Sequence, residues 1–308
     1  MTAIKRKQTQ RVVVRGLGLG GGESIRVQSM TNTKTTDVQS TIDQILRLQS
    51  AGCELVRLAI PDDASLTAFT EIRRQIDLPL IADIHFDYRL ALGALQAGAD
   101  KIRINPGNIG GRERTLEVAR EAAQRGTPIR IGVNSGSIEK DILEKYGGPE
   151  PEALVESALR QIELLTGVRD LQLVLSLKAS DVWTTIQAYR QISQLTDVPL
   201  HLGVTEAGTP FTGAIRSAIG IGTLLAEGIG DTLRVSLTGD VVQEVRVAWE
   251  ILRSLGLRRR GVEIISCPTC ARTEVDLVFI AERIAAALQD VVTPLKVAVM
   301  GCAVNGPG

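Results

Sequence analysis

Aromatic side chains and net charge are both scarce in this sequence of 308 residues. Phe, Trp and Tyr together make up only 3% of it, whereas apolar residues make up 44%. The core must therefore be built from aliphatic side chains, which is typical of parallel α/β folds. The 35 basic and 35 acidic residues cancel, so the chain has no overall attraction to nucleic acid or to an anionic membrane surface.

Long uncharged apolar runs are absent as well. No stretch approaches the roughly 18 residues that would indicate a membrane span. The N-terminal stretch Met1–Arg11 is basic, but no apolar stretch follows it, which argues against a signal peptide. We therefore expect a cytoplasmic protein. In that compartment, the four cysteines indicate a metal site or catalysis rather than disulfides.

Eight segments with the pattern of β-strands alternate with amphipathic stretches. Several of these stretches, such as Val38–Gly52 and Arg112–Gly126, end in Gly, a frequent helix stop. Repeated βα units predict a parallel sheet, and eight of them within about 250 residues predict a closed (β/α)8 TIM barrel. The expected strands are Ser24–Met30, Glu54–Ile60, Leu78–His85, Lys101–Asn105, Pro128–Asn134, Leu171–Lys178, Pro199–Thr205 and Thr232–Thr238.

A glycine-rich segment precedes the first strand. Gly16, Gly18 and Gly21 match the G-x-G-x-x-G pattern of dinucleotide-binding loops. Such a site requires a strand before the glycines and a helix after them, but here a strand follows. We therefore interpret Gly16–Gly22 as a hairpin turn that caps the bottom of the barrel.

The residues after the barrel form a second, smaller α/β unit. Leu257–Gly261 is a plausible linker between the two. We therefore predict two domains, a TIM barrel over residues 1–256 and a small α/β domain over residues 257–308. The expected elements of the small domain are the strand Val262–Ser266, the helix Val275–Gln289 and the strand Leu295–Met300.

The barrel strands alternate between apolar and polar residues, which is unusual for this fold. In the fifth strand, Ile129 and Ile131 share one face, and Arg130 lies on the other. Because the apolar face must meet the surrounding helices, the polar face must line the lumen. The lumen is therefore predicted to gather five basic side chains from five strands, namely Arg57, Arg103, Arg130, Lys178 and Arg234.

Two interpretations fit so many buried cations, since like charges are costly to bury unless they are paired. One is a structural salt-bridge network, but Asp83 is the main acid within the strands. The other is a site for a ligand with several negative charges, most simply a phosphate or diphosphate, which the forked donors of arginine suit. Active sites of this fold lie at the C-terminal strand ends, where the sequence places Asn32, His85, Asn105, Asn134, Lys178 and Glu206.

Three cysteines lie near the end of the sequence. Cys267 and Cys270 form a C-x-x-C pair, and Cys302 opens a turn rich in Gly and Pro. A structural zinc site requires four protein ligands, but this tail has no histidine. Three thiolates suit an iron–sulfur cluster, although zinc and a redox dithiol stay open as alternatives. Cys53, at a helix-to-strand junction, is expected to be a buried apolar residue.

A set of short segments is more specific than any single pattern. These segments are Val27–Thr33, Lys101–Asn108, Arg130–Asn134, Lys178–Ser180, Thr205–Gly208, Ser266–Cys270 and Gly301–Gly308. In this order, and over essentially the whole chain, they resemble the motifs of the 4-hydroxy-3-methylbut-2-enyl diphosphate synthases of the non-mevalonate isoprenoid pathway. The spacing resembles the two-domain bacterial type.

The resemblance implies an activity. Such synthases convert 2-C-methyl-D-erythritol 2,4-cyclodiphosphate to (E)-4-hydroxy-3-methylbut-2-enyl diphosphate, by a reductive ring opening with loss of water. A 4Fe–4S cluster supplies the electrons, and flavodoxin or ferredoxin recharges it. The resemblance also implies a homodimer in which the tail of one chain caps the barrel of the other.

The resemblance assigns roles to residues of this sequence. Cys267, Cys270 and Cys302 would be the cysteine ligands of the cluster. Glu206 would supply the proton for the departing hydroxyl, although it could instead be a structural partner of a nearby arginine. The substrate-binding side chains would be Arg57, Asp83, His85, Arg103, Asn105, Arg130, Asn134, Lys178 and Arg234.

The fourth cluster ligand of such synthases is a glutamate directly after Asn-Gly-Pro-Gly. The sequence given stops at Gly308, where that glutamate would follow. We therefore expect a chain of only these residues to hold a labile cluster with three cysteine ligands.

Two other classes of protein fit part of the pattern. A pterin-binding or corrinoid-type methyltransferase barrel also binds an anionic, oxygen-rich ligand, but it would not need the cysteine-containing tail. A cluster-sensing regulator would usually present a basic face to nucleic acid. The zero net charge and the 3% aromatic content argue against such a face.

Overall fold

The computed structural model describes residues 4–305. The chain divides into two units, Met1–Leu257 and Arg258–Gly308. Among the described residues, no helix is both long enough and apolar enough to cross a membrane.

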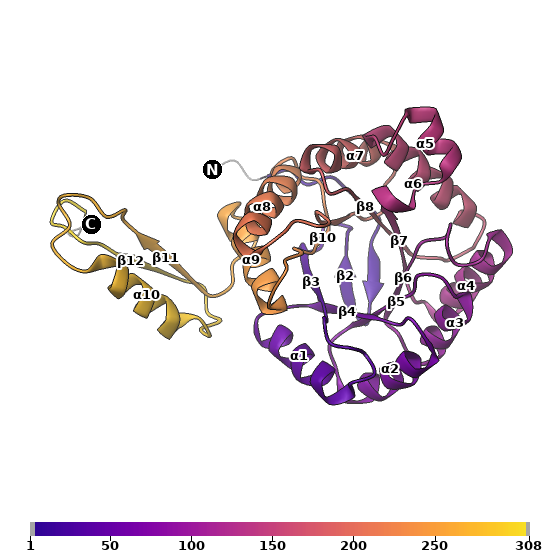
Figure 1. The fold of residues 1–308 in the computed structure, drawn as a ribbon, viewed down its shortest axis with the longest axis horizontal. Coiled ribbons are helices and arrows are strands. Elements are labelled where there is room, and N and C mark those ends of the chain that lie inside the picture. The colour runs from indigo at the N-terminus through magenta and orange to yellow at the C-terminus, as the bar shows by residue number, and fades with distance from the viewer. Residues whose placement is uncertain (1–3, 306–308) are drawn as a thin grey trace. The chain divides into compact units, whose positions relative to one another are not determined.

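The first unit is a parallel barrel of eight strands with helices around it, as Figure 1 shows. The strand order is β8-β7-β6-β5-β4-β3-β10-β9, and a parallel bridge between Leu175 and Leu200 joins the two ends of this order. The predicted TIM barrel is thus confirmed. Its strands are β3 (Arg26–Met30), β4 (Leu55–Ala59), β5 (Leu80–Asp83), β6 (Lys101–Ile104), β7 (Ile129–Asn134), β8 (Leu173–Lys178), β9 (His201–Leu202) and β10 (Thr232–Leu233).

Helices connect successive strands and cover the outer face of the barrel (Figure 1). Several begin at an aspartate whose carboxylate accepts a backbone N–H of the first turn, as Asp37, Asp62 and Asp181 do. The core between strands and helices is mainly aliphatic, as the composition predicts. The helices are α1 (Val38–Ser50), α2 (Asp63–Gln75), α3 (Tyr88–Gln96), α4 (Arg112–Arg125), α5 (Lys140–Tyr146), α6 (Pro151–Leu165), α7 (Val182–Leu195), α8 (Pro210–Ala226) and α9 (Val241–Ser254).

All eight barrel strands are shorter than the sequence predicts, and two of them are reduced to two paired residues each. We expected strands over 199–205 and 232–238, but only His201–Leu202 and Thr232–Leu233 pair as strands. Side-chain packing in the lumen explains part of this difference. A Cβ atom on Gly203 would lie 2.5 Å from the Nζ atom of Lys178, so the backbone after β9 makes room for that lysine.

An antiparallel hairpin closes the bottom of the barrel. β1 (Val12–Val14) pairs with β2 (Leu17–Leu19), and Arg15 and Gly16 form the turn at φ angles of 48° and 79°. A hairpin is present as predicted, but the turn expected over Gly16–Gly22 is wrong in its bounds, because Leu17–Leu19 form the second strand. The dinucleotide-binding interpretation is excluded because the strand β3 follows. The buried residues of this apolar plug are Val12, Val14, Leu19, Leu55, Ile81 and Val174.

The plug should contribute measurably to stability. Leu19 has no exposed surface, so Leu19→Ala would leave a cavity at the bottom of the lumen. We expect the free energy of unfolding to fall by about 2–5 kcal/mol in urea denaturation. Leu17→Ala, at a half-buried position of the same strand, is the control and should cost clearly less. Equal losses in the two variants would contradict the packing described here.

The second unit is a two-stranded parallel sheet with one helix. β11 (Val262–Ser266) pairs with β12 (Leu295–Val299), and α10 (Leu277–Leu288) lies between them in the sequence. A parallel pair requires a crossover connection of this kind. Because Ser266 is paired with Val299, the segments that follow the two strands leave the sheet side by side. The predicted small α/β unit is confirmed.

Candidate functional site

A polar pocket of about 220 Å³ lies in the barrel lumen and extends to the C-terminal ends of the strands. Its wall also includes Met30, Ser176, Thr205 and Ser236. The alternation of polarity along the strands therefore identified the lumen face correctly, although the roles toward a ligand remain predictions. The predicted ligand-binding side chains that line the pocket are Arg57, Asp83, His85, Arg103, Arg130, Asn134, Lys178 and Arg234.

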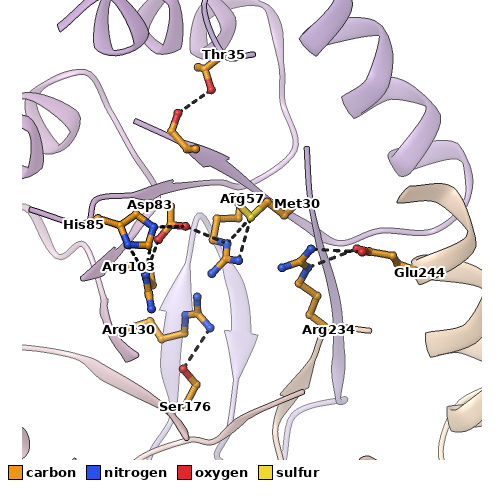
Figure 2. Close-up of polar contacts among 11 residues, drawn as sticks. Met30, Thr35, Arg57, Asp83, His85, Arg103, Arg130, Ser176, Arg234 and Glu244 are labelled. Atoms are coloured by element: carbon orange, nitrogen blue, oxygen red, sulfur yellow. Dashed lines mark hydrogen bonds and ion pairs between the residues drawn. The ribbon is translucent and has the colours of Figure 1, made fainter. Parts of the chain in front are cut away.

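Asp83 joins the basic side chains on one side of this pocket, as Figure 2 shows. Its Oδ2 atom lies 3.6 Å from Nε of Arg57 and 3.5 Å from Nε2 of His85, and its Oδ1 atom lies 3.3 Å from Nη1 of Arg103. Burial alone would raise the pKa of Asp83, but Arg57, His85 and Arg103 together hold it well below its ordinary value. The carboxylate therefore stays ionised and neutralises part of the positive charge.

Arg57 has an unusual second partner. Its Nη2 and Nε atoms lie 2.9 Å and 3.1 Å from the Sδ atom of Met30. A thioether is a weak hydrogen-bond acceptor. Burial lowers the pKa of Arg57 to about 10, and the attraction of Asp83 opposes this only in part. Arg57 is therefore left with donor capacity toward the pocket.

A second carboxylate reaches a lumen arginine from the helix α9. Glu244 on α9 is only 2% exposed, and its two oxygen atoms accept from Nη2 and Nε of Arg234 at 3.3 Å and 3.4 Å (Figure 2). It also accepts from Oγ of Ser29 and from the backbone N–H of Leu237, both at 3.0 Å. The sequence analysis named only Asp83 and missed this acid. The sequence feature that could have identified Glu244 is its position on the buried face of α9, beside Val245.

Two cations of the pocket have no carboxylate partner. Among residues 4–305, no carboxylate oxygen lies within 4.0 Å of the charged groups of Arg130 and Lys178. Arg130 donates to Oγ of Ser176 at 3.3 Å, and its Nε and Nη2 atoms have no partner. Burial, followed by repulsion from neighbouring cations, lowers the pKa of both side chains well below their ordinary values. Such an arrangement is favourable only when an anion enters the pocket.

Two predicted site residues lie outside the wall of this pocket. Asn105 is buried, and its Oδ1 atom accepts from the backbone N–H of Gly107 at 3.1 Å. Glu206 is exposed beside the wall residue Thr205, and its Oε2 atom accepts from Oγ of Ser180 at 2.5 Å. The φ angle of Glu206, 52°, is rare for a residue with a side chain and marks a constrained turn.

The structure brings the segments that contain the tail cysteines together. Cys267 directly follows β11, and Cys302 follows β12, at the end where the two strands leave the sheet side by side. The backbone N–H of Glu274 donates to the carbonyl of Gly301 at 2.9 Å, which holds the two loops against each other. A hydrogen bond from the backbone of Arg272 is the main cause that lowers the pKa of the Cys270 thiol. These features favour thiolate ligands.

The geometry of a complete metal site is not formed in the described residues. Within residues 4–305, no three Cys, His, Asp or Glu side chains lie close enough together to hold a metal ion. The predicted ligand role of Cys267, Cys270 and Cys302 thus stays a prediction, and Gly306–Gly308 lie outside the described residues. Cys53 is 3% exposed, and burial raises its pKa to about 12, which agrees with the expected apolar role.

Comparisons with known proteins agree with this architecture. A family model described as the GcpE TIM-barrel domain matches residues 9–249, and the GcpE protein C-terminal domain matches residues 263–308. The chain belongs to the GcpE family. The two matched domains correspond to the barrel and to the small α/β unit.

Relatives of the GcpE chain carry the name 4-hydroxy-3-methylbut-2-en-1-yl diphosphate synthase (flavodoxin). The protein of Caldanaerobacter subterraneus subsp. tengcongensis is 56% identical over 303 residues, which cover 98% of this chain and 85% of the relative. The protein of Ruminiclostridium cellulolyticum is 56% identical over 305 residues, which cover 99% of this chain and 86% of the relative. The resemblance found in the sequence motifs is therefore confirmed.

Solved structures with a similar fold include dihydropteroate synthases. The structure from Stenotrophomonas maltophilia has a TM-score of 0.59 at 14% identity and covers 80% of this chain and 98% of that chain. The structure from Yersinia pestis has a TM-score of 0.54 at 15% identity and covers 81% of this chain and 100% of that chain. Identity this low shows a shared barrel fold and carries no pterin chemistry to the GcpE chain.

The ion pairs of Asp83 predict a dependence of stability on pH. Because folding holds the pKa of Asp83 below its value of about 3.9 in unfolded chains, its stabilising contribution is present above that pH and is lost as the pH falls further. Asp83→Asn should lower the free energy of unfolding by about 3–5 kcal/mol near neutral pH, because it leaves buried cations unpaired. Urea denaturation at several pH values should show this difference shrink in acid.

Asp141→Asn is the matched control for this prediction. Asp141 also forms an ion pair, with Arg160 at 2.8 Å, but its side chain is exposed. Its replacement should leave the free energy of unfolding nearly unchanged, because solvent screens the exposed pair. A cost for Asp83→Asn no larger than that of the control would show that Asp83 does not stabilise the lumen.

Proposed function

We propose that the chain is a 4-hydroxy-3-methylbut-2-enyl diphosphate synthase. This oxidoreductase converts 2-C-methyl-D-erythritol 2,4-cyclodiphosphate to (E)-4-hydroxy-3-methylbut-2-enyl diphosphate in isoprenoid biosynthesis. The substrate gains two electrons, a ring C–O bond breaks, and water leaves. The observation that carries the proposal is the set of buried lumen cations without carboxylate partners, in a chain whose relatives bear the name of this synthase.

The barrel, residues 1–256, is the substrate domain in this proposal. The unpaired donors of Arg130 and Lys178 would bind diphosphate oxygens, and Arg57 and Arg103 would add donors that Asp83 holds in place. Fixed cations stabilise the negative charge that remains on the diphosphate when the ring C–O bond breaks. The other proposed contacts, at the pocket wall and beside it, are His85, Asn105, Asn134 and Arg234.

Glu206 is the proposed proton donor for the departing hydroxyl. It lies on the loop after β9, directly after the wall residue Thr205. In the structure its carboxyl group is bound to Ser180, so it must exchange this bond for one to the substrate. A general acid in this position needs to reach hydrogen-bond distance only in the complex.

The tail, residues 257–308, is the proposed cluster domain. Cys267, Cys270 and Cys302 would hold a 4Fe–4S cluster, since their loops lie together and backbone hydrogen bonding lowers the pKa of the Cys270 thiol. The cluster supplies the electrons, and we propose that flavodoxin or ferredoxin delivers them in the cytoplasm. We also propose a homodimer, which sedimentation analysis of the full chain would test.

Lys178 tests the proposed ligand. Lys178→Ala should raise the Kd for the cyclic diphosphate by roughly 10- to 100-fold, because a basic donor with no carboxylate partner is lost. Calorimetric titration of the anaerobically purified protein measures the change. Lys145→Ala, which removes a lysine on the surface, should leave the affinity unaltered. Unchanged affinity in Lys178→Ala would rule out this lysine as a ligand-binding residue.

The activity itself is tested by turnover with reduced flavodoxin under anaerobic conditions. The wild type should form the linear diphosphate from the cyclic one, detected by mass spectrometry, and failure to do so would refute the proposed function. Glu206→Gln should bind substrate normally but turn over roughly 100-fold more slowly, the scale of a lost general acid. Ser180→Ala removes the hydrogen-bond partner of Glu206 and keeps the acid, so it should retain most of the rate. Near-normal turnover of Glu206→Gln would exclude the acid role.

A further inference from the structure

Lys101 lies deep in the barrel lumen and takes no part in the mechanism described above. It is the first residue of β6, on the same face as Arg103, and it has no exposed surface. Its register partner on β5 is Ile81, which belongs to the apolar plug at the bottom of the barrel. The Nζ atom of Lys101 has no hydrogen-bond partner. Across residues 4–305, no carboxylate oxygen lies within 4.0 Å of it.

The groups that act electrostatically on Lys101 from the neighbouring strands are cations or neutral. Arg130 on β7 and Arg57 on β4 repel an ammonium group at this position, and His201 on β9 is buried and neutral. Asp83, two residues beyond Ile81 on β5, is engaged with Arg57 at 3.6 Å and with Arg103, the next lumen residue of β6, at 3.3 Å.

A lysine in such surroundings gives up its proton. Arginine stays protonated in proteins, whereas a buried lysine can become neutral. Burial, followed by repulsion from Arg130 and then from Arg57, lowers the pKa of Lys101 well below its ordinary value. Burial without a partner beside two cations therefore favours the neutral amine in the ligand-free protein, which explains how Lys101 can lie in an apolar environment.

We propose that Lys101 takes up a proton from water when the anionic substrate binds in the pocket. This inference rests on the proposed function, since the ligand is the cyclic diphosphate. Arg57 and Arg130 both line the pocket, so the bound anion would offset the two charges that repel Lys101. With that repulsion reduced, the amine gains one N–H bond and becomes an ammonium, and the buffer supplies the proton.

The proton uptake would serve the reaction. Opening the ring turns a cyclic diphosphate into a terminal one, which carries more negative charge. A cation that forms beneath Arg130 after binding would add to the positive potential in the lumen as this charge develops. The free protein would avoid the cost of keeping another unpaired ammonium buried. Lys101 is thus a positioning residue for charge rather than a group that touches the substrate.

Calorimetry on the full chain tests the proposal directly. The cyclic diphosphate is titrated into the anaerobic protein near neutral pH, in buffers that differ in ionisation enthalpy, and the slope of the binding enthalpy gives the number of protons taken up. Lys178 can also gain a proton, so the decisive quantity is the difference between variants. Lys101→Met should take up fewer protons than the wild type, by about one per chain.

Gln28→Leu is the matched control. Gln28 is another buried lumen side chain whose polar atoms lack partners, but it cannot titrate. This control should keep the proton uptake of the wild type. Equal uptake in Lys101→Met and the wild type, or an equal loss in Gln28→Leu, would overturn the inference while leaving the proposed function intact. Absence of any binding heat in the wild type would instead refute the proposed ligand.

A second measurement needs no ligand. In the unfolded chain Lys101 is protonated up to about pH 10, so the unfolded state binds one proton more than the folded state in this range. The free energy of unfolding of the wild type should therefore rise with pH, relative to Lys101→Met, from about pH 7 to about pH 10. Lys101→Met should fold and be at least as stable as the wild type at neutral pH. A difference in stability that does not depend on pH would show that folding leaves the protonation of Lys101 unchanged and would overturn the inference.

Discussion

The excess of positive charge inside the barrel is the constraint on which the rest of the structure depends. Six basic side chains point into the lumen, and among the described residues two carboxylates, Asp83 within it and Glu244 on the helix α9, pair with them. Asp83 links β4, β5 and β6, and Glu244 links the helix α9 to β10. These two acids hold the arginines on opposite sides of the pocket and leave the cations between them for a ligand. The basic residues are Arg57, Lys101, Arg103, Arg130, Lys178 and Arg234.

The lumen could be predicted from the sequence because strand periodicity is a local property. Side chains alternate between the two faces of a strand, and the face that meets the helices must be apolar. Arg103 and Arg130 could therefore be assigned to the lumen face from the sequence alone. The same rule places Lys101 on the lumen face with Arg103, although the sequence analysis did not include it among the lumen cations. The hairpin could also be predicted, because the glycine-rich segment before β3 is a local feature of the sequence.

Other features depend on tertiary contacts, which the sequence does not encode locally. Glu244 reaches Arg234 only because α9 packs against β3, so a search restricted to strands could not find it. The short pairing of β9 reflects the space that Lys178 requires beside Gly203. Whether Glu206 faces the pocket depends on a turn with a positive φ angle, and no periodic pattern describes such a turn. The barrel shared with dihydropteroate synthases shows the same limit, since the fold alone does not determine the lumen chemistry.

The hairpin at the bottom of the barrel restricts how substrate and product move into and out of the lumen. Its apolar side chains fill the end of the lumen opposite the C-terminal ends of the strands. In the part of the chain that the structure describes, the lumen is therefore open only at those C-terminal ends. Water that an arriving substrate displaces must leave past that substrate, and the product must leave through the opening by which the substrate entered. Substrate entry and product release therefore cannot occur at the same time. Product that stays bound at the opening blocks the next substrate sterically.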